Sequence, residues 1–415
     1  MRRVVITGIG VVSPAGSNAK EHFKSILNGK SGIDKISLFD VSTMLVKIGG
    51  EIKNIPFESL YSDCPELKTI TDRKIYFGFM ALQEAIHDAR LSDRIKECGL
   101  NLGVSLEVLP IEKLVFPDSK INLADFFAGY LKNNQSLQVP LDTLSMLMIR
   151  KYKISGPSYI NCSACAASTQ TIGHSFRKIR RGDNDIFICG GYDSMLNPLG
   201  LGGFSLLGAL SEKNELKDKA SRPYDRERDG AILGEGAGII VLEELDSALK
   251  RGAKIYAEVV GYGSSLDAYR STDPEPTGAG AEQSIRSALD DAQITPQYID
   301  YINGHGTSTP KNDLVETKAI KKVFGDQAYN IPISSTKSML GHLIAASGAV
   351  EIISALTGFL FNKLHPTINY EYPDPTCDLD YIPNVMREWD GKYILKNSFG
   401  FGGQNACLIV KRYEK

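Results

Sequence analysis

The sequence predicts an α/β protein in which sheets are covered by helices. Short segments rich in β-branched residues alternate with segments of helical periodicity, and the second part of the chain repeats the rhythm of the first. At 415 residues the chain is too long for one small core. We therefore expect two similar α/β halves, residues 1–251 and 252–415.

The alternation is clearest in the first half. Residues 72–89 have helical periodicity, with Ile75, Phe79 and Ile86 on one face. The other elements expected here are extended segments at 4–7, 158–161, 186–189 and 238–242 and helices at 19–27 and 166–180.

The second half contains counterparts of these units. Residues 256–263 resemble 4–10, and the segment from 331 to 334, followed by a helix near 342–360, resembles the unit around Cys165. In a duplicated fold, catalytic groups are expected where the halves meet, because pockets commonly form there.

Composition excludes several classes of function. Hydrophobic residues make up 42% and charged residues 23%, with a formal net charge of −2 and no block of like charges. Nucleic acids and anionic membranes need a concentrated basic surface, so neither is an expected partner. A small acidic carrier protein needs only a local basic patch and stays possible.

No secretory signal or membrane span is expected. The apolar run at the start ends after a few residues, and the most apolar stretch, 345–361, contains Glu351 and is interpreted as a buried helix. The seven cysteines are scattered and odd in number, unlike a disulfide framework. A cytoplasmic location is therefore predicted.

Gly8-Ile9-Gly10 is close to a dinucleotide-binding fingerprint. The third glycine is absent and Pro14 follows soon after, so the close helix–strand packing of that motif is lost. We expect a structural turn here rather than a nucleotide site.

Cys162 and Cys165 form a C-x-x-C pair. A zinc site would need a second pair of ligands, which the sequence lacks, and a redox pair is expected in a much smaller chain. Cys165 instead follows a small-residue turn between a strand and a helix. Helix-start N–H groups there would stabilise a thiolate, lowering a pKa of about 8.5, and hold an oxyanion. Cys165 is thus a candidate nucleophile, whereas Cys162 and Cys189 are expected to be structural.

Two of the six histidines lie in unusual settings. His305 and His342 are both flanked by glycine in strand-end loops, where backbone and ligand can come close. The others are expected to be structural: His22, His87, His174 and His365.

Together these residues suggest one chemistry. A soft nucleophile can take an acyl group from a thioester, and two neutral imidazole N–H groups can stabilise the enolate formed when malonyl loses carbon dioxide. Lys337 is the nearby cation that would keep both rings neutral. Its own charge would be offset by Glu351, Asp313 and Glu316.

The chain resembles the β-ketoacyl-acyl-carrier-protein synthases, in particular the type II, chain-elongating group of the thiolase-fold superfamily. The resemblance covers nearly the whole chain. It is carried by residues 5–10, 163–165, 221–230, 234–238, 305–310, 335–351 and 397–403.

This resemblance implies a five-layer αβαβα duplication that works as a homodimer without a metal or redox cofactor. It implies that Cys165 is acylated, that His305 and His342 serve decarboxylation and condensation, and that acyl carrier protein delivers the acyl and malonyl thioesters. Further roles implied are the site's charge (Lys337, Glu351), contacts to the pantetheine arm (Thr307, Thr309), an oxyanion hole (N–H of Cys165 and Phe401), a gate (the Phe401 ring) and other substrate contacts (Phe204, Phe399, Leu106, Arg270).

Two departures from the family concern specificity. Residues 104–110, with Leu106, Glu107, Val108 and Leu109, replace a Gly-rich segment that helps line the acyl pocket, and Arg270 stands where His is common. Acyl preference should therefore differ from long saturated chains. Both fatty-acid synthesis and a specialised polyketide or polyene pathway remain open.

Two rival functions differ in class. A non-catalytic chain-length partner in a heterodimer typically lacks the nucleophilic cysteine, which is present here. A cysteine hydrolase needs only one base and does not explain two glycine-flanked histidines together with Lys337.

Overall fold

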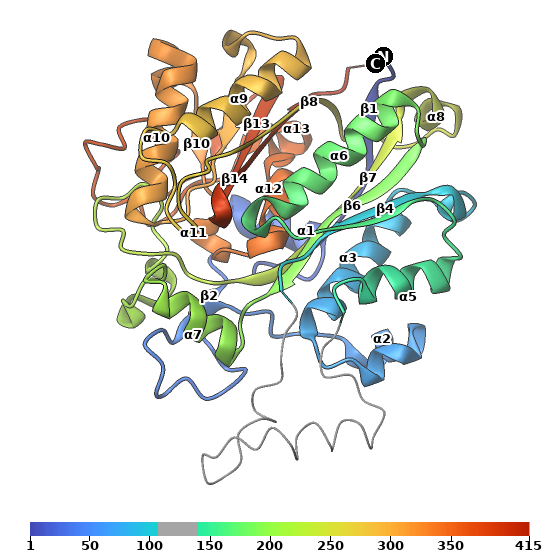
Figure 1. Ribbon diagram of the computed structural model, residues 1–415, viewed down its shortest axis with the longest axis horizontal. Coiled ribbons are helices and arrows are strands. Elements are labelled where there is room, and N and C mark those ends of the chain that lie inside the picture. The colour runs from blue at the N-terminus through green and yellow to red at the C-terminus, as the bar shows by residue number, and fades with distance from the viewer. Residues whose placement is uncertain (107–139, 415) are drawn as a thin grey trace.

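A computed structural model describes residues 1–106 and 140–414, and Figure 1 shows its ribbon. The strands of the main sheet are β1 (Val4–Val12), β4 (Gly99–Gly103), β5 (Ser158–Asn161), β6 (Ile186–Ser194), β7 (Glu235–Glu244), β8 (Ala257–Leu266), β9 (Tyr301–Asn303), β10 (Ile333–Ser334), β13 (Tyr393–Gly400) and β14 (Gln404–Lys411). Two small pairs are β2 (Ile33–Lys35) with β3 (Ile48–Gly50), and β11 (Lys363–Leu364) with β12 (Arg387–Glu388).

The helices are α1 (Ala19–Leu27), α2 (Phe57–Asp63), α3 (Arg73–Asp88), α5 (Thr143–Tyr152), α6 (Ala167–Arg181), α7 (Pro198–Leu206), α8 (Leu245–Lys250), α9 (Ala279–Ala292), α10 (Pro310–Phe324), α11 (Lys337–Leu340), α12 (Ser347–Ala355) and α13 (Thr357–Phe361). Short 3₁₀ turns at η4 (Ala164–Ala166), η8 (Ile344–Ala346) and η9 (Phe401–Gly403) build the site.

The strand order repeats itself. The sheet runs β10-β9-β13-β14-β8 and continues as β1-β7-β6-β4-β5. Numbered within its own half, each set reads 3-2-4-5-1 from its outer edge, with two parallel pairings followed by two antiparallel ones. The sets join where residues 4–6 of β1 pair with 257–259 of β8.

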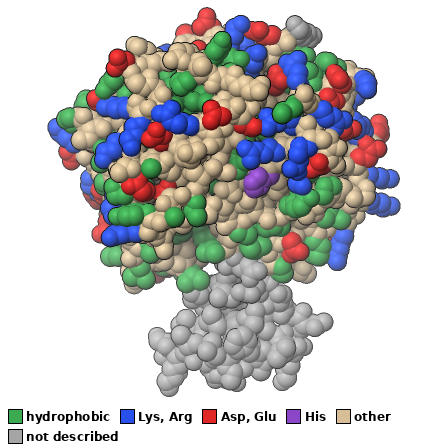
Figure 2. All heavy atoms as spheres, turned by 45° about the horizontal axis from the view of Figure 1, so that its top comes forward, with side chains coloured by type: hydrophobic (Ala, Val, Ile, Leu, Met, Phe, Trp, Pro, Cys, Tyr) green, Lys and Arg blue, Asp and Glu red, His purple; other side chains and the backbone are tan. Residues whose placement is uncertain are grey.

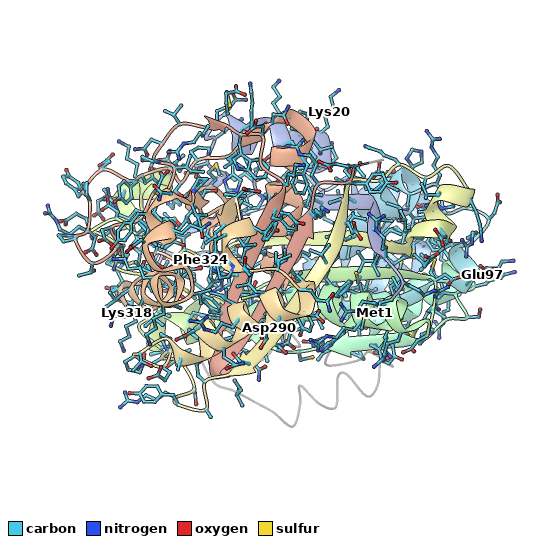
Figure 3. All side chains as sticks on the ribbon, turned by 90° about the horizontal axis from the view of Figure 1, so that it is seen from above. Met1, Lys20, Glu97, Asp290, Lys318 and Phe324 are labelled. Carbon is cyan, nitrogen blue, oxygen red and sulfur yellow. The ribbon has the colours of Figure 1, made fainter. Side chains whose placement is uncertain are left out.

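Helices form three layers around these strands. α3 packs on β1, β6 and β7, while α9 packs on β8 and β14 with α10 beside it. Figure 3 shows α9 and α10, marked by Asp290, Lys318 and Phe324, on the side away from Glu97. Between the two sets of strands lie α6 and α12, each of which contacts strands of both. The expected five-layer α/β fold is confirmed.

Apolar residues on both faces of the strands explain this layering. In β7, Ile239 and Val241 join the core beneath α3, whereas Ile240 and Leu242 join the core around α6 and α12. Alternating side chains point to opposite faces of a strand, so β7 is covered by a helix layer on each side.

Gly8 and Gly10 do not form the expected turn, because β1 runs straight through them. A Cβ at Gly8 would lie 2.5 Å from the Ala89 Cβ, and one at Gly10 would lie 2.0 Å from the Ala81 carbonyl oxygen. The glycines therefore let α3 approach β1 closely. The turn prediction was wrong because these residues also satisfy a strand that lies directly beneath a helix.

Residues 344–361 are long and apolar enough to cross a membrane, with a mean hydropathy of 1.8. They form η8, α12 and α13, and 83% of the stretch is buried inside the protein.

Candidate active site

Two equivalent turns, one from each half of the strand pattern, meet at the site. η4 follows β5 and leads into α6, while η8 lies between β10 and α12, and the two turns are in contact. Their first residues, Ala164 and Ile344, share the same φ of 46°. Residues other than glycine seldom adopt this left-handed conformation, and such strain gathers at functional sites.

Cys165 lies inside the first turn and is only 4% exposed. The backbone N–H groups of Phe401 and of Cys165 itself lie near its sulfur and favour the thiolate form. Gly400 allows η9 to come this close, since a Cβ there would lie 3.2 Å from the Cys165 nitrogen. Backbone N–H groups beside a nucleophile are the kind of donor from which an oxyanion hole is built.

Burial raises the pKa of the Cys165 thiol to about 11. The Phe401 N–H and Lys337 favour the thiolate, whereas Asp193 opposes it. The expected lowering of this pKa was therefore wrong: the desolvation of a fully enclosed sulfur outweighs one turn of amides and a cation. The resting nucleophile is a thiol.

The loop that carries His305 is held by carboxylates of α10. Glu316 accepts hydrogen bonds from the backbone N–H groups of His305 (2.7 Å) and Gly306 (2.8 Å), and Asp313 accepts one from Thr307 (3.0 Å). Thr309 caps α10 just ahead of Pro310, a usual helix start.

Lys337 determines which nitrogen of His305 carries the proton. The Lys337 Nζ lies 3.2 Å from Nδ1 of His305, 2.7 Å from its carbonyl oxygen and 2.5 Å from Oε1 of Glu351. An ammonium group can only donate, so Nδ1 accepts and the hydrogen of the neutral ring lies on Nε2.

His342 has the same tautomer for a different reason. The Ile344 N–H donates to its Nδ1 at 3.2 Å, and the Ser347 hydroxyl lies 2.9 Å from the same atom. Because that hydroxyl oxygen accepts from the Leu343 N–H (3.0 Å), its own hydrogen is free for Nδ1. The two imidazole centroids are 5.4 Å apart at 82°.

Both imidazoles stay neutral. Burial, and then the charge of Lys337, hold the pKa of each well below its ordinary value, and Lys396 contributes to both. Two neutral rings with Nε2–H groups form a pair of hydrogen-bond donors.

The charges are arranged differently from the expectation. Of the three carboxylates expected to offset Lys337, only Glu351 contacts it. A second buried lysine, Lys396, lies 2.9 Å from the other oxygen of Glu351. Asp313 lies 3.7 Å from Arg228 instead, and Glu316 binds backbone amides. This corrects the prediction that Asp313 and Glu316 offset Lys337: α10 directs its carboxylates at the His305 loop.

A cavity of about 290 Å³ joins these groups. Phe401 stacks on Phe204, with ring centroids 5.9 Å apart and 22° between the planes, and both rings line the cavity. The other predicted residues that line it are Cys165, His305, His342, Thr307, Thr309 and Phe399.

Leu106 and Arg270 do not line this cavity. The Leu106 side chain is 63% exposed, and its carbonyl accepts from buried Lys74 (2.7 Å). Arg270 is exposed and lies 3.4 Å from Asp273 at the cavity wall. The neighbouring residues 107–110 lie outside the described residues, and the specificity role of this segment stays a prediction.

Sequence reasoning missed four residues of the site: Lys396, Ser347, Asp193 and Asp267. Lys396 had a visible signal, since a charge placed directly after the apolar run 393–395 must find a buried partner if the strand continues into the core. Asp267, which lines the cavity and accepts from Asn405 at 2.6 Å, had none. Among the described residues, no group of three or more His, Cys, Asp or Glu is arranged to hold a metal ion.

Family comparisons agree over most of the chain. Residues 1–248 match the family model described as "Beta-ketoacyl synthase, N-terminal domain", and residues 256–371 match the one described as "Beta-ketoacyl synthase, C-terminal domain". The chain is 41% identical to 3-oxoacyl-[acyl-carrier-protein] synthase 2 of Synechocystis sp. over 416 residues, which cover 100% of this chain and 99% of that protein. It is 41% identical to the synthase 2 of Coxiella burnetii over 419 residues, 99% of each chain.

Solved structures agree as well. A β-ketoacyl synthase from Burkholderia phymatum superposes with a TM-score of 0.86 at 30% identity over both full chains. A type II polyketide-synthase acyl-carrier protein in complex with its ketosynthase gives 0.85 at 34%, and the ishigamide ketosynthase/chain length factor gives 0.85 at 32%, again over 100% of each chain.

Proposed function

Because this chain belongs to the β-ketoacyl synthase family, we propose that it condenses an acyl group held on Cys165 with malonyl-acyl carrier protein, releasing carbon dioxide and 3-oxoacyl-acyl carrier protein. One observation carries the proposal: a single cavity holds a buried thiol facing two backbone N–H groups and two neutral imidazoles with Nε2–H groups. The backbone N–H groups can stabilise the oxyanion formed during acyl transfer, and the two imidazoles can stabilise the enolate formed during condensation.

The first step transfers the acyl group. The Cys165 sulfur attacks the thioester carbonyl, the carbonyl oxygen becomes an oxyanion held by the N–H groups of Cys165 and Phe401, and the pantetheine sulfur leaves with the thiol proton. A thiol whose pKa is raised to about 11 loses its proton as it attacks rather than beforehand. Phe401 lies between glycines, so its ring can move aside for the second substrate.

The second step makes the carbon–carbon bond. Malonyl loses carbon dioxide, and the electron pair left behind forms an enolate whose oxygen accepts from the Nε2–H groups of His305 and His342. The enolate carbon attacks the acyl carbonyl and expels the Cys165 sulfur as a thiolate, which takes up a proton from solvent to restore the thiol. Thr307 and Thr309, whose hydroxyls are 2.9 Å apart, are proposed to hold the pantetheine arm. The chemistry needs no metal or redox cofactor, because the chain supplies nucleophile and donors.

The test incubates the enzyme with acyl- and malonyl-carrier protein and identifies products by mass spectrometry. A 3-oxoacyl product supports the proposal. Absence of turnover supports a chain-length partner, and free acid supports a thioester hydrolase. Cys165→Ala should abolish the product and Cys162→Ala should keep it, since only Cys165 faces both N–H groups.

Assembly and pathway belong to the same proposal. β5 is an edge strand with Ser158 and Tyr159 exposed, and an open edge favours pairing with a second copy into a homodimer. Mass photometry of Tyr159→Lys against the parent chain tests this; pairing only with a different chain-length subunit would overturn it. Relatives named 3-oxoacyl-[acyl-carrier-protein] synthase 2 favour fatty-acid synthesis over the alternatives. We also propose a cytoplasmic location for the protein. Competition among saturated and polyunsaturated acyl substrates, repeated with Leu106→Gly, separates that pathway from a polyketide or polyene one.

A further inference from the structure

Lys396 is a buried cation that takes no part in either of the two proposed steps. It lies on β13 and is fully buried. Its Nζ is 2.9 Å from Oε2 of Glu351, donates to the Ser398 hydroxyl at 3.2 Å and also donates to the Asn397 carbonyl oxygen. Glu351 therefore lies between two ammonium groups, with Lys337 on its other oxygen.

The placement connects Lys396 to the imidazoles. Glu351 is the ion-pair partner of Lys337, and Lys337 binds both Nδ1 and the carbonyl oxygen of His305. Each oxygen of Glu351 thus forms an ion pair with a buried ammonium group, although Oε2 accepts no hydrogen bond. Turning the carboxylate would separate both pairs of opposite charges, so the second lysine restricts its orientation. The chain Lys396–Glu351–Lys337–His305 consists entirely of such short contacts.

We propose that Lys396 is a positioning residue for the condensation step: by fixing Oε2 of Glu351, it holds Lys337 against His305. This rests on the proposed function. A lysine also keeps a positive charge behind both rings, and the pKa values of His305 and His342 are lowered partly by it. Burial lowers the pKa of Lys396 itself, and Glu351 opposes that effect.

Charged and titratable groups from several elements face this cluster. Glu351 on α12 and Glu316 on α10 act to raise the pKa of Lys396, and Lys337 on α11 acts to lower it. Lys396 in turn acts to lower the pKa of the Cys407 thiol on β14. The charge of Glu351 acts to raise the pKa of Tyr301 on β9 and that of His365. With both lysines charged, the three groups in direct contact carry one net positive charge, and replacing Lys396 by a neutral residue removes it.

A purely structural role for Lys396 is disfavoured by the free energy needed to bury its charge. Removing two ammonium groups and a carboxylate from water is expensive, and apolar residues of similar volume commonly replace buried ion pairs without loss of stability. Lys396 belongs to a cluster that contacts the imidazole of His305, so its charge can act on the condensation step.

The test compares Lys396→Met with Lys411→Met, a matched change at the surface end of β14. In Lys396→Met we expect acylation of Cys165 within about twofold of the parent and condensation lower by about tenfold, a usual size for coupling in one charged network. The acid limb of the condensation rate should move up by about one pH unit, because losing a nearby positive charge raises an imidazole pKa. Lys411→Met should change none of these.

A double-mutant cycle with Glu351→Gln separates positioning from packing. If Lys396 acts through Glu351, the double variant Glu351→Gln/Lys396→Met should condense no more slowly than Glu351→Gln alone. Its condensation rate should in fact recover in part, because Glu351→Gln leaves two ammonium groups without a carboxylate and Lys396→Met removes one of them. Additive losses, or equal losses in acylation and condensation, would overturn the role of Lys396. Absence of condensation in the parent enzyme would instead overturn the proposed function, so the two failures are distinguishable.

Discussion

The raised pKa of the Cys165 thiol gives a quantitative prediction. With a pKa of about 11, about one part in a thousand is thiolate at pH 8, against about a quarter for an ordinary cysteine of pKa about 8.5. That difference slows alkylation by about 240-fold. The more basic thiolate is about tenfold more nucleophilic, because reactivity rises with pKa with a slope of about 0.45. Iodoacetamide should therefore modify Cys165 about 20-fold more slowly than an ordinary cysteine at pH 8.

Two variants should shift this rate in opposite directions. Lys337 favours the thiolate and Asp193 disfavours it. Lys337→Met should therefore slow alkylation at fixed pH, and Asp193→Asn should accelerate it. For a shift of about one pKa unit the thiolate fraction changes about tenfold, and the opposing change in nucleophilicity reduces the effect on the rate to about three- to fourfold.

The assay follows intact mass after iodoacetamide at pH 6 to 10, in a Cys162→Ser background so that the exposed cysteine does not contribute. Peptide mapping confirms the modified residue, and Cys165→Ser gives the background. The rate should rise about tenfold per pH unit through pH 9. A plateau below pH 9, or variants that shift the rate in the same direction, would refute an electrostatic origin for the pKa.

Three further predictions concern the donors and the fold. His305→Ala and His342→Ala should each leave acylation of Cys165 largely intact and lower condensation by about 10²–10³-fold; quantifying acyl-enzyme and 3-oxoacyl product in one reaction checks this, and near-parental condensation would remove that histidine from the mechanism. Ser347→Ala should lower condensation by about tenfold, since it removes one of two donors to His342 Nδ1 and leaves the Leu343 N–H unpaired; product formation by the single variant, at parental acylation, is the measurement. Gly10→Ala should destabilise the fold by about 1–3 kcal/mol or more through overpacking against α3, whereas Gly202→Ala, with open space around its Cβ, should not; urea unfolding compares them, and equal midpoints would contradict the close-packing account of β1.

The sequence was informative where local pattern and chemistry coincide. Alternating periodicity predicted α1 at its observed bounds and α3 to within one residue at each end, and glycine-flanked histidines identified His305 and His342. Those signals are local, because caps, turns and close approach depend on neighbours in the chain.

The rest depended on long-range placement. The thiol pKa follows from complete burial, which one turn of sequence does not reveal. Asp313 and Glu316 were expected to offset the charge of Lys337, but α10 directs both carboxylates to the loop that precedes it. Lys396 and Glu351 are 45 positions apart on different elements, and only the packing of β13 against α12 brings them together.

The two matched turns at Ala164 and Ile344 carry different reactive groups. The same strained bend occurs twice, with a sulfur inside one turn and an imidazole just before the other. The proposed nucleophile and one of the proposed proton donors therefore lie on segments far apart in the sequence, and a substitution beside one turn reaches the other only through the contact between the turns.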